Sequence, residues 1–337
     1  MVSRLERIDT EFEKLLTEHR NPRTVRIDRV EVVKALKMIN REDRKVARAV
    51  ELEIPRIARA VESVVQAFKK GGRLIYVGAG TSGRIGVVDA AECPPTFGTS
   101  PSMVQALIAG GRRAMFKAVE GAEDDMRAGV KDVKRLKVSE RDVVIGLSAS
   151  GRAPYVIGAL KEARRRGAET IAVATVPNPR IGSYASIVIT PIVGPEAIAG
   201  STRMKAGTAE KMVLNMISTV SMVRIGKVYT NLMIDIKPLS VKLRSRARRL
   251  LRFFTGISSE EAEEIYRRSR YDLKVALVMA LARVEAEEAR KALRKSQGLV
   301  WKAIKLVREE EKDLGNTGHP GFKTRRRSRR KPSDYPK

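Results

Sequence analysis

Serine, threonine and glycine residues gather in three short stretches whose composition suits binding of a phosphate group. The stretches are VGAGTSGRIG at 77–86, SASGR at 148–152 and GSTRMKAGTAEK at 200–211. The first two follow apolar runs, and each of the three precedes a helical pattern. Hydroxyls and unpaired backbone N–H groups at the start of a helix bind phosphate well. The predicted phosphate-binding residues are Thr81, Ser82, Ser148, Ser150, Arg152, Ser201, Thr202 and Lys205.

The first stretch also has the glycine spacing of a nucleotide-binding loop. Glycines 78, 80 and 83 match G-x-G-x-x-G, which is a weak signal alone. A dinucleotide site would carry an acid at the end of the second strand, but residues 108–111 read Ile-Ala-Gly-Gly. No Lys-Ser or Lys-Thr pair follows the glycines, so a Walker loop is also excluded. A single such turn is more simply a tightly packed helix cap, whereas three together favour a small phosphorylated ligand.

Two glutamates are candidates for proton transfer. Glu92 stands among alanines, a cysteine and two prolines, an apolar setting that would raise its pKa. Glu123 stands beside Asp124, whose like charge would also raise a pKa. Two carboxyls with separated pKa values form an acid/base pair. The alternatives are a surface acid on a helix for Glu92 and a solvated helical turn for Glu123. Spacing alone does not separate Glu123 from Glu120.

The elements that must position these residues alternate between strand and helix. Apolar runs predict strands at 74–78, 104–108, 143–147, 170–174 and 187–190, and helical spacing predicts helices at 54–70, 154–166 and 208–224. Runs without alternation indicate a parallel sheet covered on both faces. The fold class is therefore α/β with a doubly wound parallel sheet, and ligands are expected at the carboxyl ends of its strands.

The two ends of the chain differ from this middle part. We expect an N-terminal helical segment at 1–50, a phosphate-binding α/β domain at 51–244 and a small helical C-terminal subdomain at 245–310. Ser258 or Ser259, followed by acids, has the signature of a helix start. Residues 311–337 contain the run KTRRRSRRK at 323–331 and are predicted to form a disordered basic tail. The tail is interpreted either as an arm for nucleic acid or another polyanion, or as a solubilising appendage.

Composition limits the classes of function. Lysine and arginine number 67 against 39 acids, a net charge of +28 that attracts anions from sugar phosphates to nucleic acids. With 43% hydrophobic residues the chain is globular. It has a single cysteine, Cys93, and no long apolar run, so we expect a cytoplasmic protein without a membrane span. Cys93 suits packing better than nucleophilic attack, and neither His19 nor His319 belongs to a Ser-His-Asp pattern.

These motifs resemble those of a known protein family. GAGTSGR with SASGR resembles the sugar isomerase (SIS) domain, which binds phosphosugars. Longer blocks are similar to those of the N-acetylmuramic acid 6-phosphate etherases over about residues 4–305. These blocks include RLIYVGAGTSGRIGVVDAAECPPTFG at 73–98, AVEGAEDD at 118–125 and TPIVGPEAIAGSTRMKAGTAEKMVLNMIST at 190–219. Glucokinase regulatory protein shares several blocks, which leaves a non-catalytic phosphosugar sensor as the alternative.

The resemblance implies an enzyme that removes D-lactate from carbon 3 of the phosphosugar by elimination and then hydration, in amino-sugar catabolism and cell-wall recycling. It implies Glu92 as the proton donor and Glu123 as the base, with no cofactor and no metal. It also implies a homodimer, whose active site we expect to be completed across the interface. A nucleic-acid-binding function rests on charge alone, because aromatic residues make up only 4% of the chain.

Overall fold

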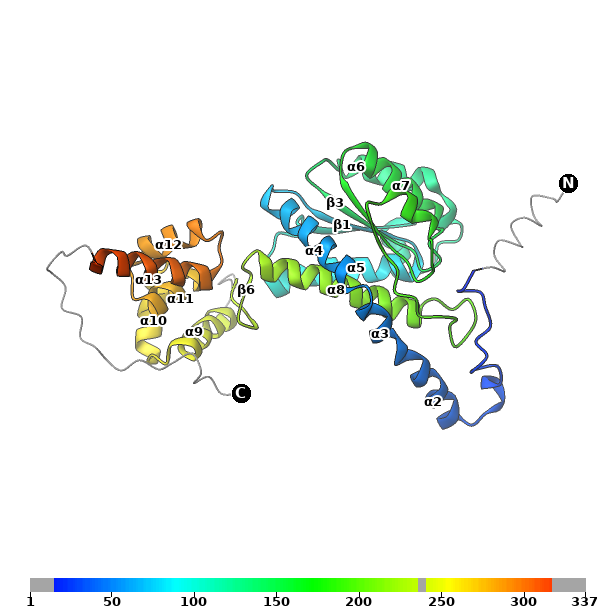
Figure 1. Cartoon of the computed structure of the whole chain (residues 1–337), viewed down its shortest axis with the longest axis horizontal. Coiled ribbons are helices and arrows are strands. Elements are labelled where there is room, and N and C mark those ends of the chain that lie inside the picture. The colour runs from blue at the N-terminus through cyan, green and yellow to red at the C-terminus, as the bar shows by residue number, and fades with distance from the viewer. Residues whose placement is uncertain (1–14, 236–240, 317–337) are drawn as a thin grey trace.

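Five parallel strands form the central sheet of the computed structural model, which describes residues 15–235 and 241–316. The strand order is β2-β1-β3-β4-β5 (Figure 1). The strands are β1 (Leu74–Gly78), β2 (Val104–Ile108), β3 (Val143–Leu147), β4 (Glu169–Val173) and β5 (Ile187–Ile189). The predicted strands are thus confirmed, with β4 and β5 differing from prediction by one residue at their ends.

Helices cover both faces of this sheet, so the predicted doubly wound α/β fold is confirmed. One face carries α3 (Lys45–Glu51), α4 (Ile54–Lys69), α5 (Gly80–Phe97) and α8 (Lys205–Arg224). The other carries α6 (Met126–Arg135) and α7 (Pro154–Arg165) (Figure 1). Side chains alternate between the two cores, with Leu74 and Tyr76 of β1 in one and Ile75 and Val77 in the other. The continuous apolar runs in the sequence arise from this double burial.

The N-terminal helices do not form a unit of their own. A short turn, η1 (Ile27–Arg29), leads into α2 (Val32–Asp43), whose apolar residues Val32, Val33 and Leu36 are exposed. In contrast, Val46 and Val50 of α3 are buried in the core beneath α8. The α/β domain therefore begins before residue 50, earlier than its predicted start at residue 51.

Short 3-10 helices follow several strands. They are η2 (Gly111–Met115), η3 (Ala122–Asp124) and η4 (Arg180–Tyr184). η3 immediately precedes α6 and contacts α7, so its acidic residues lie beside these two helices. Among the described helices, none is long and apolar enough to cross a membrane.

A second core lies in the C-terminal part of the chain (Figure 1). It is built by β6 (Val228–Tyr229), β7 (Leu232–Met233), α9 (Val241–Thr255), α10 (Ser259–Arg268), α11 (Leu273–Ala282), α12 (Ala286–Lys295) and α13 (Val300–Asn316). The β6–β7 hairpin was not predicted, and it starts this unit before residue 245. Ser258 caps α10 in a capping box with Glu261, as its position suggested. α13 continues to Asn316, beyond the predicted end at 310, and the KTRRRSRRK run lies outside the described residues.

Candidate functional site

The first Ser/Gly turn joins β1 to α5 at the carboxyl edge of the sheet. Gly83 lies so near the strand that a Cβ there would be 2.7 Å from the Gly78 carbonyl oxygen, so glycine allows this close packing. The residue before the helix, Ala79, provides no side-chain cap. The first backbone N–H groups of an α-helix have no partner within the helix. The start of α5, with Thr81 half-buried beside it, is therefore suited to an anion.

The second turn lies next to the first because β1 and β3 are neighbours, with Gly78 paired to Leu147. Ser148 is buried, and its hydroxyl oxygen accepts hydrogen bonds from the backbone N–H groups of Arg152 (3.2 Å) and Ala153 (3.4 Å). Ser148 therefore shapes the turn. Ser150 and Arg152 are half-buried at its surface, where their side chains are better placed for a ligand.

The third turn lies at the same edge of the sheet, but a side chain of the protein already binds the N–H groups at the start of its helix. A Cβ on Gly207 would lie 3.3 Å from the Thr81 methyl group, so this segment lies beside the first turn. At the start of α8, however, the N–H groups of Lys205 (3.0 Å) and Ala206 (2.8 Å) donate to the buried Glu196 carboxylate. A protein carboxylate thus occupies the place that a phosphate would take. Of the three predicted phosphate-binding residues in this turn, Ser201 and Thr202 are half-buried and remain accessible, as does the exposed side chain of Arg203.

The position of Lys205 does not fit its predicted role as a phosphate ligand. Its side chain is 1% exposed, and its ammonium donates to Glu42 (2.7 Å) and to the carbonyl oxygens of Val193 (2.9 Å) and Pro195 (2.7 Å). An ammonium has three N–H donors, and all three are used. Lys205 therefore ties α2 and the 193–195 loop to α8, and we correct its assignment from phosphate ligand to structural cation.

Ser82 contacts Glu210, an acid that was not among the predicted site residues. Its hydroxyl donates to Glu210 Oε1 at 2.9 Å. Glu210 is fully buried, and its other carboxyl oxygen has no partner among the described residues. Burial raises the pKa of Glu210 to about 8, and only the hydrogen bond from Ser82 opposes that shift. A carboxyl group that is neutral below about pH 8 thus lies directly behind the first turn.

Glu123 lies in η3, which contacts the helix that follows the second turn. Its pKa is raised because the surrounding protein partly desolvates it and, to a smaller extent, because Asp124 is adjacent. Asp125 caps α6 by accepting from the N–H of Ala128 and is therefore occupied. Glu120 and Glu123 are both exposed in the single chain, so a ligand can reach either of them. A base with a raised pKa at this edge suits proton abstraction near neutral pH.

Glu92 lies elsewhere. It follows Gly80 by 12 residues on α5, which at 1.5 Å per residue is about 18 Å from the first turn. α5 runs back from the carboxyl edge of the sheet, so Glu92 lies toward the opposite edge. Its side chain is exposed, whereas its neighbours Ala90 and Cys93 face the core. The apolar setting predicted for Glu92 is thus not found within one protomer, and one protomer does not bring Glu92 and Glu123 together.

A buried polar network fixes the part of α5 that carries Glu92. Asp89 accepts hydrogen bonds from Tyr76 (2.7 Å) on β1 and from Asn215 (2.6 Å) and Ser218 (3.1 Å) on α8. The network joins strand and helices one turn before Glu92. Asp89 was not among the predicted residues, although an acid within the apolar stretch 87–91 was a signal that could have indicated it. Burial raises the pKa of the Cys93 thiol to about 12, so the interpretation of Cys93 as a packing residue is preferred over a nucleophile.

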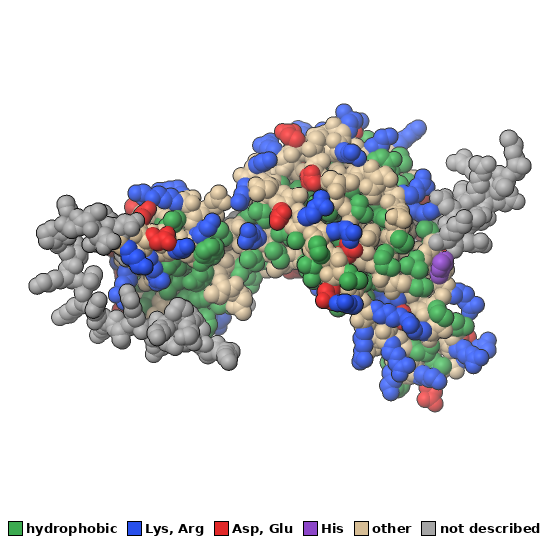
Figure 2. Space-filling model, viewed as in Figure 1, with side chains coloured by type: hydrophobic (Ala, Val, Ile, Leu, Met, Phe, Trp, Pro, Cys, Tyr) green, Lys and Arg blue, Asp and Glu red, His purple; other side chains and the backbone are tan. Residues whose placement is uncertain are grey.

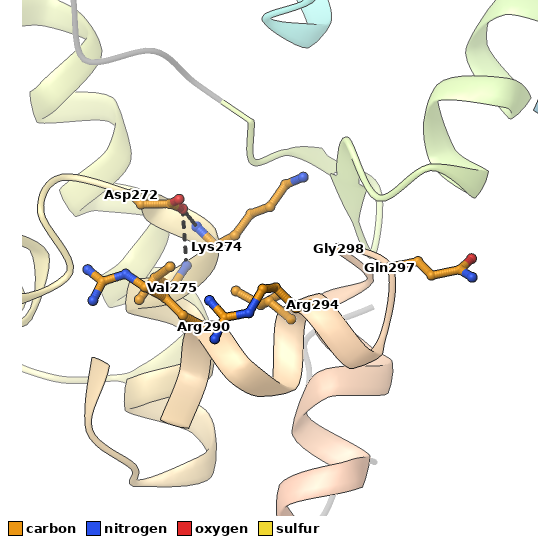
Figure 3. Close-up of a pocket in the computed structure, with 8 residues that line it drawn as sticks. Asp272, Lys274, Val275, Arg290, Arg294, Gln297 and Gly298 are labelled. Atoms are coloured by element: carbon orange, nitrogen blue, oxygen red, sulfur yellow. Dashed lines mark hydrogen bonds between the residues drawn. The ribbon is translucent and has the colours of Figure 1, made fainter. Parts of the chain in front are cut away.

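A separate hollow of about 380 Å³ lies in the C-terminal unit (Figure 3). It is lined by Lys274, Arg290 and Arg294 around apolar Val275 and Leu293. Lys274 pairs with Asp235, and Arg290 donates to Glu287 and to a backbone carbonyl. The hollow is formed by residues 272–298, which include none of the predicted site residues. Lys and Arg side chains are also spread widely over the rest of the visible surface (Figure 2).

The fold and its paired Ser/Gly turns define a SIS-domain protein. The SIS domain model matches residues 118–219, and the model of the glucokinase regulatory protein N-terminal SIS domain matches residues 56–164. The chain belongs to the N-acetylmuramic acid 6-phosphate etherase family. It is 53% identical over 295 residues to the etherase of Caldanaerobacter subterraneus subsp. tengcongensis, with 88% of this chain and 96% of the relative covered. It is 52% identical over 290 residues to that of Yersinia pestis, with 86% and 98% covered. Similarity across whole etherases does not favour the regulatory alternative.

Proposed function

We propose that this protein is an enzyme that cleaves the D-lactyl ether of N-acetylmuramic acid 6-phosphate, giving N-acetylglucosamine 6-phosphate and D-lactate. The observation that carries the proposal is the convergence, at one sheet edge, of two adjoining Ser/Gly turns and a glutamate with a raised pKa. The turns supply hydroxyl and N–H donors for a phosphate that does not react. Family membership supplies the identity of the sugar. The reducing environment that suits one buried cysteine supports a cytoplasmic site of action.

The chemistry follows from the open-chain form of the sugar, in which the aldehyde acidifies the proton on carbon 2. Glu123 removes this proton. The electron pair forms a double bond between carbons 2 and 3 as the bond from carbon 3 to the lactyl oxygen breaks, and Glu92 donates the proton that this oxygen takes up. Water then adds to the alkene, with its oxygen on carbon 3 and a proton on carbon 2. In this addition Glu92 takes a proton from the water and Glu123 returns its proton to carbon 2, so both carboxyls regain their starting states. Elimination and hydration thus each need one positioned proton acceptor and one donor, which these two carboxyls supply.

The separation of Glu92 from Glu123 supports a site shared between two protomers. Val88, one turn before Glu92 on α5, is 57% exposed, and Val220 and Val223 on the adjoining helix α8 are also exposed. Phe116, in the segment that carries Glu123, is 95% exposed. Large apolar side chains at these places suit a protein interface. We therefore infer a homodimer in which Glu92 of one protomer reaches the phosphate turns and Glu123 of the other.

The direct test is incubation with N-acetylmuramic acid 6-phosphate and enzymatic detection of D-lactate. Glu92→Gln and Glu123→Gln are each expected to lower the rate about 10²–10⁴-fold while binding of N-acetylglucosamine 6-phosphate persists. Glu120→Gln is the matched control, because Glu120 is a neighbouring exposed acid. A large loss in Glu120→Gln with a normal rate in Glu123→Gln would move the base to Glu120. Absence of lactate release by the wild-type protein would refute the proposal.

The shared site has its own test. Glu92→Gln and Glu123→Gln chains carrying different tags are co-expressed, and the mixed dimer is purified through both tags. In a two-fold symmetric dimer with a shared site, one site then has both substitutions and the other has neither. The mixed dimer should recover about half of wild-type activity per dimer. A mixed dimer as inactive as the two single variants would place both glutamates in one protomer.

A further inference from the structure

The buried pair of Ser82 and Glu210 lies where one proton decides what the first turn offers to a ligand. Ser82 is the third residue of α5, and Glu210 lies on α8 behind it. Their oxygens are 2.9 Å apart. Glu210 Oε2 is buried without a partner among the described residues, so the carboxyl group is not held by any second donor.

A serine hydroxyl has only one proton to donate. If Glu210 is ionised, its oxygen accepts that proton, and Ser82 presents lone pairs toward the phosphate turn. If Glu210 is neutral, its own O–H can donate to Ser82 Oγ across the same contact. The Ser82 proton is then available to a phosphate oxygen. The two protonation states of Glu210 therefore present opposite hydrogen-bonding faces at the same position.

We propose that Glu210 is a positioning residue whose protonation turns the Ser82 hydroxyl toward the substrate phosphate, so that phosphosugar binding and proton uptake by Glu210 are coupled. The inference rests on the proposed function, because it takes a phosphosugar as the ligand of the first turn. The raised pKa of Glu210, about 8, places the change within the range in which the protein can be assayed.

Charged groups on the surrounding elements do not provide Glu210 with an ion pair. On α8 itself, Lys205 is bound to Glu42 and Lys211 is exposed. On α5, Arg84 donates to the Met115 carbonyl oxygen, and Asp89 is held by Tyr76, Asn215 and Ser218. The charged side chains of α3 and α4 either pair elsewhere or lie exposed; they are Lys45, Arg48, Glu51, Arg56, Arg59, Glu62 and Lys69. The strand β6 carries no charged residue. Desolvation therefore governs the protonation of Glu210, and a ligand that prefers the neutral form raises its pKa further.

The size of the coupling follows from the fraction of protein in the binding-competent state. If the neutral form binds and the pKa is about 8, that form is about 90% populated at pH 7 and about 10% at pH 9, so the apparent Kd rises about tenfold over this interval. Binding at pH 8 should take up about half a proton per site, because half of the sites must gain one.

The test is calorimetric binding of N-acetylglucosamine 6-phosphate between pH 7 and 9 to the full-length wild-type protein and to Glu210→Gln. The glutamine amide is nearly isosteric with the carboxyl group and donates to Ser82 at every pH. The Kd of this variant should therefore change by less than about twofold between pH 7 and 9, whereas the Kd of the wild type rises about tenfold. Titration of the ligand is the same for both proteins and cancels in the comparison.

Each outcome bears on the inference. A constant wild-type Kd, or an equal weakening in Glu210→Gln, overturns it while leaving the etherase proposal intact. No binding at any pH overturns both. If Glu210→Gln does not fold, proton uptake by the wild type is measured at pH 8 in two buffers of different ionisation enthalpy. About half a proton taken up supports the coupling, and none overturns it.

Discussion

Replacing Lys205 by methionine separates a structural role from a ligand-binding one. Methionine retains most of the length and apolar character of the lysine stem but removes the ammonium. The ammonium is held by Glu42 and two carbonyl oxygens in a setting that is 1% exposed. We expect Lys205→Met to destabilise the fold strongly, because it leaves a buried carboxylate and two buried carbonyls without their common donor.

The magnitude follows from Glu42. Burial alone would raise its pKa, but hydrogen bonds from Lys205, Lys45 and Asn21 outweigh burial and lower the pKa from 4.5 to about 2. A difference of that size corresponds to about 3 kcal/mol. Removal of one member of a buried pair costs about 3–5 kcal/mol, and Lys45, 2.5 Å from Glu42, offsets part of the loss. We therefore expect a loss of about 3 kcal/mol, which lowers Tm by about 10 °C.

The assay is thermal unfolding at pH 7, with Lys211→Met as the control because Lys211 is an exposed lysine on the same helix. The control should change stability by less than about 0.5 kcal/mol. Since the folded pKa of Glu42 is lowered, its stabilisation is present above pH 4.5 and is lost as the pH falls toward 2. The Tm difference between wild type and Glu42→Gln should shrink over that range. An unchanged Tm in Lys205→Met, with a raised KM for the phosphosugar, would refute this reasoning and return Lys205 to the ligand site.

Three further expectations can be checked with the same protein. Ser82→Ala should raise KM for the muramic acid phosphate about tenfold with little change in kcat. Ser148→Ala should also lower Tm, because two backbone N–H groups lose their acceptor. Equal effects of the two variants on KM and Tm would contradict the separation of a ligand-binding Ser82 from a turn-forming Ser148. The folded pKa of Glu210 lies above its ordinary value, so wild-type stability should fall as pH rises from 4.5 to about 8, by up to about 1.4 kcal/mol per pH unit, and denaturant titrations of Glu210→Gln should lack that slope. Deleting residues 317–337 should leave lactate release unchanged. Because the deletion removes the seven cations of KTRRRSRRK, the slope of log K against log salt concentration for single-stranded RNA binding should fall in magnitude by up to about 5. Identical slopes would show that the tail takes no part in RNA binding.

The sheet and its helices could be predicted because their signals are local. Glycines after Lys70 end α4 where expected, and the buried positions of that helix are the ones with helical spacing. The start of α8 was predicted three residues late, because the Lys-Ala-Gly turn that begins it resembles a loop. The β6–β7 hairpin has only two residues per strand, too few for alternation to show. Likewise, the exposed surface of α2 gave no local sign that α3, only two residues further on, enters the core.

The candidate site was predicted less completely because its chemistry depends on contacts between distant segments. Ser82, Ser148 and Thr202 lie at one edge, as the motifs indicated. Spacing did not show that Glu196 caps α8 or that Glu42, 163 residues from Lys205, binds its ammonium. Nor did it show at which edge of the sheet Glu92 lies, because that depends on the length and direction of α5.

Lys205 and Glu210 show why such contacts decide function. Both are charged residue types on one helix, five positions apart, and both are buried, although Lys205 was predicted as a phosphate ligand and Glu210 was not singled out. Lys205 meets a carboxylate from α2, so both groups remain charged and the pair fixes the loop around the third turn. Glu210 meets only a hydroxyl, so desolvation favours its neutral form. The same burial therefore gives a rigid support at one position and a proton-dependent contact with the phosphate turn at the other, and the difference lies in the residue opposite each of them.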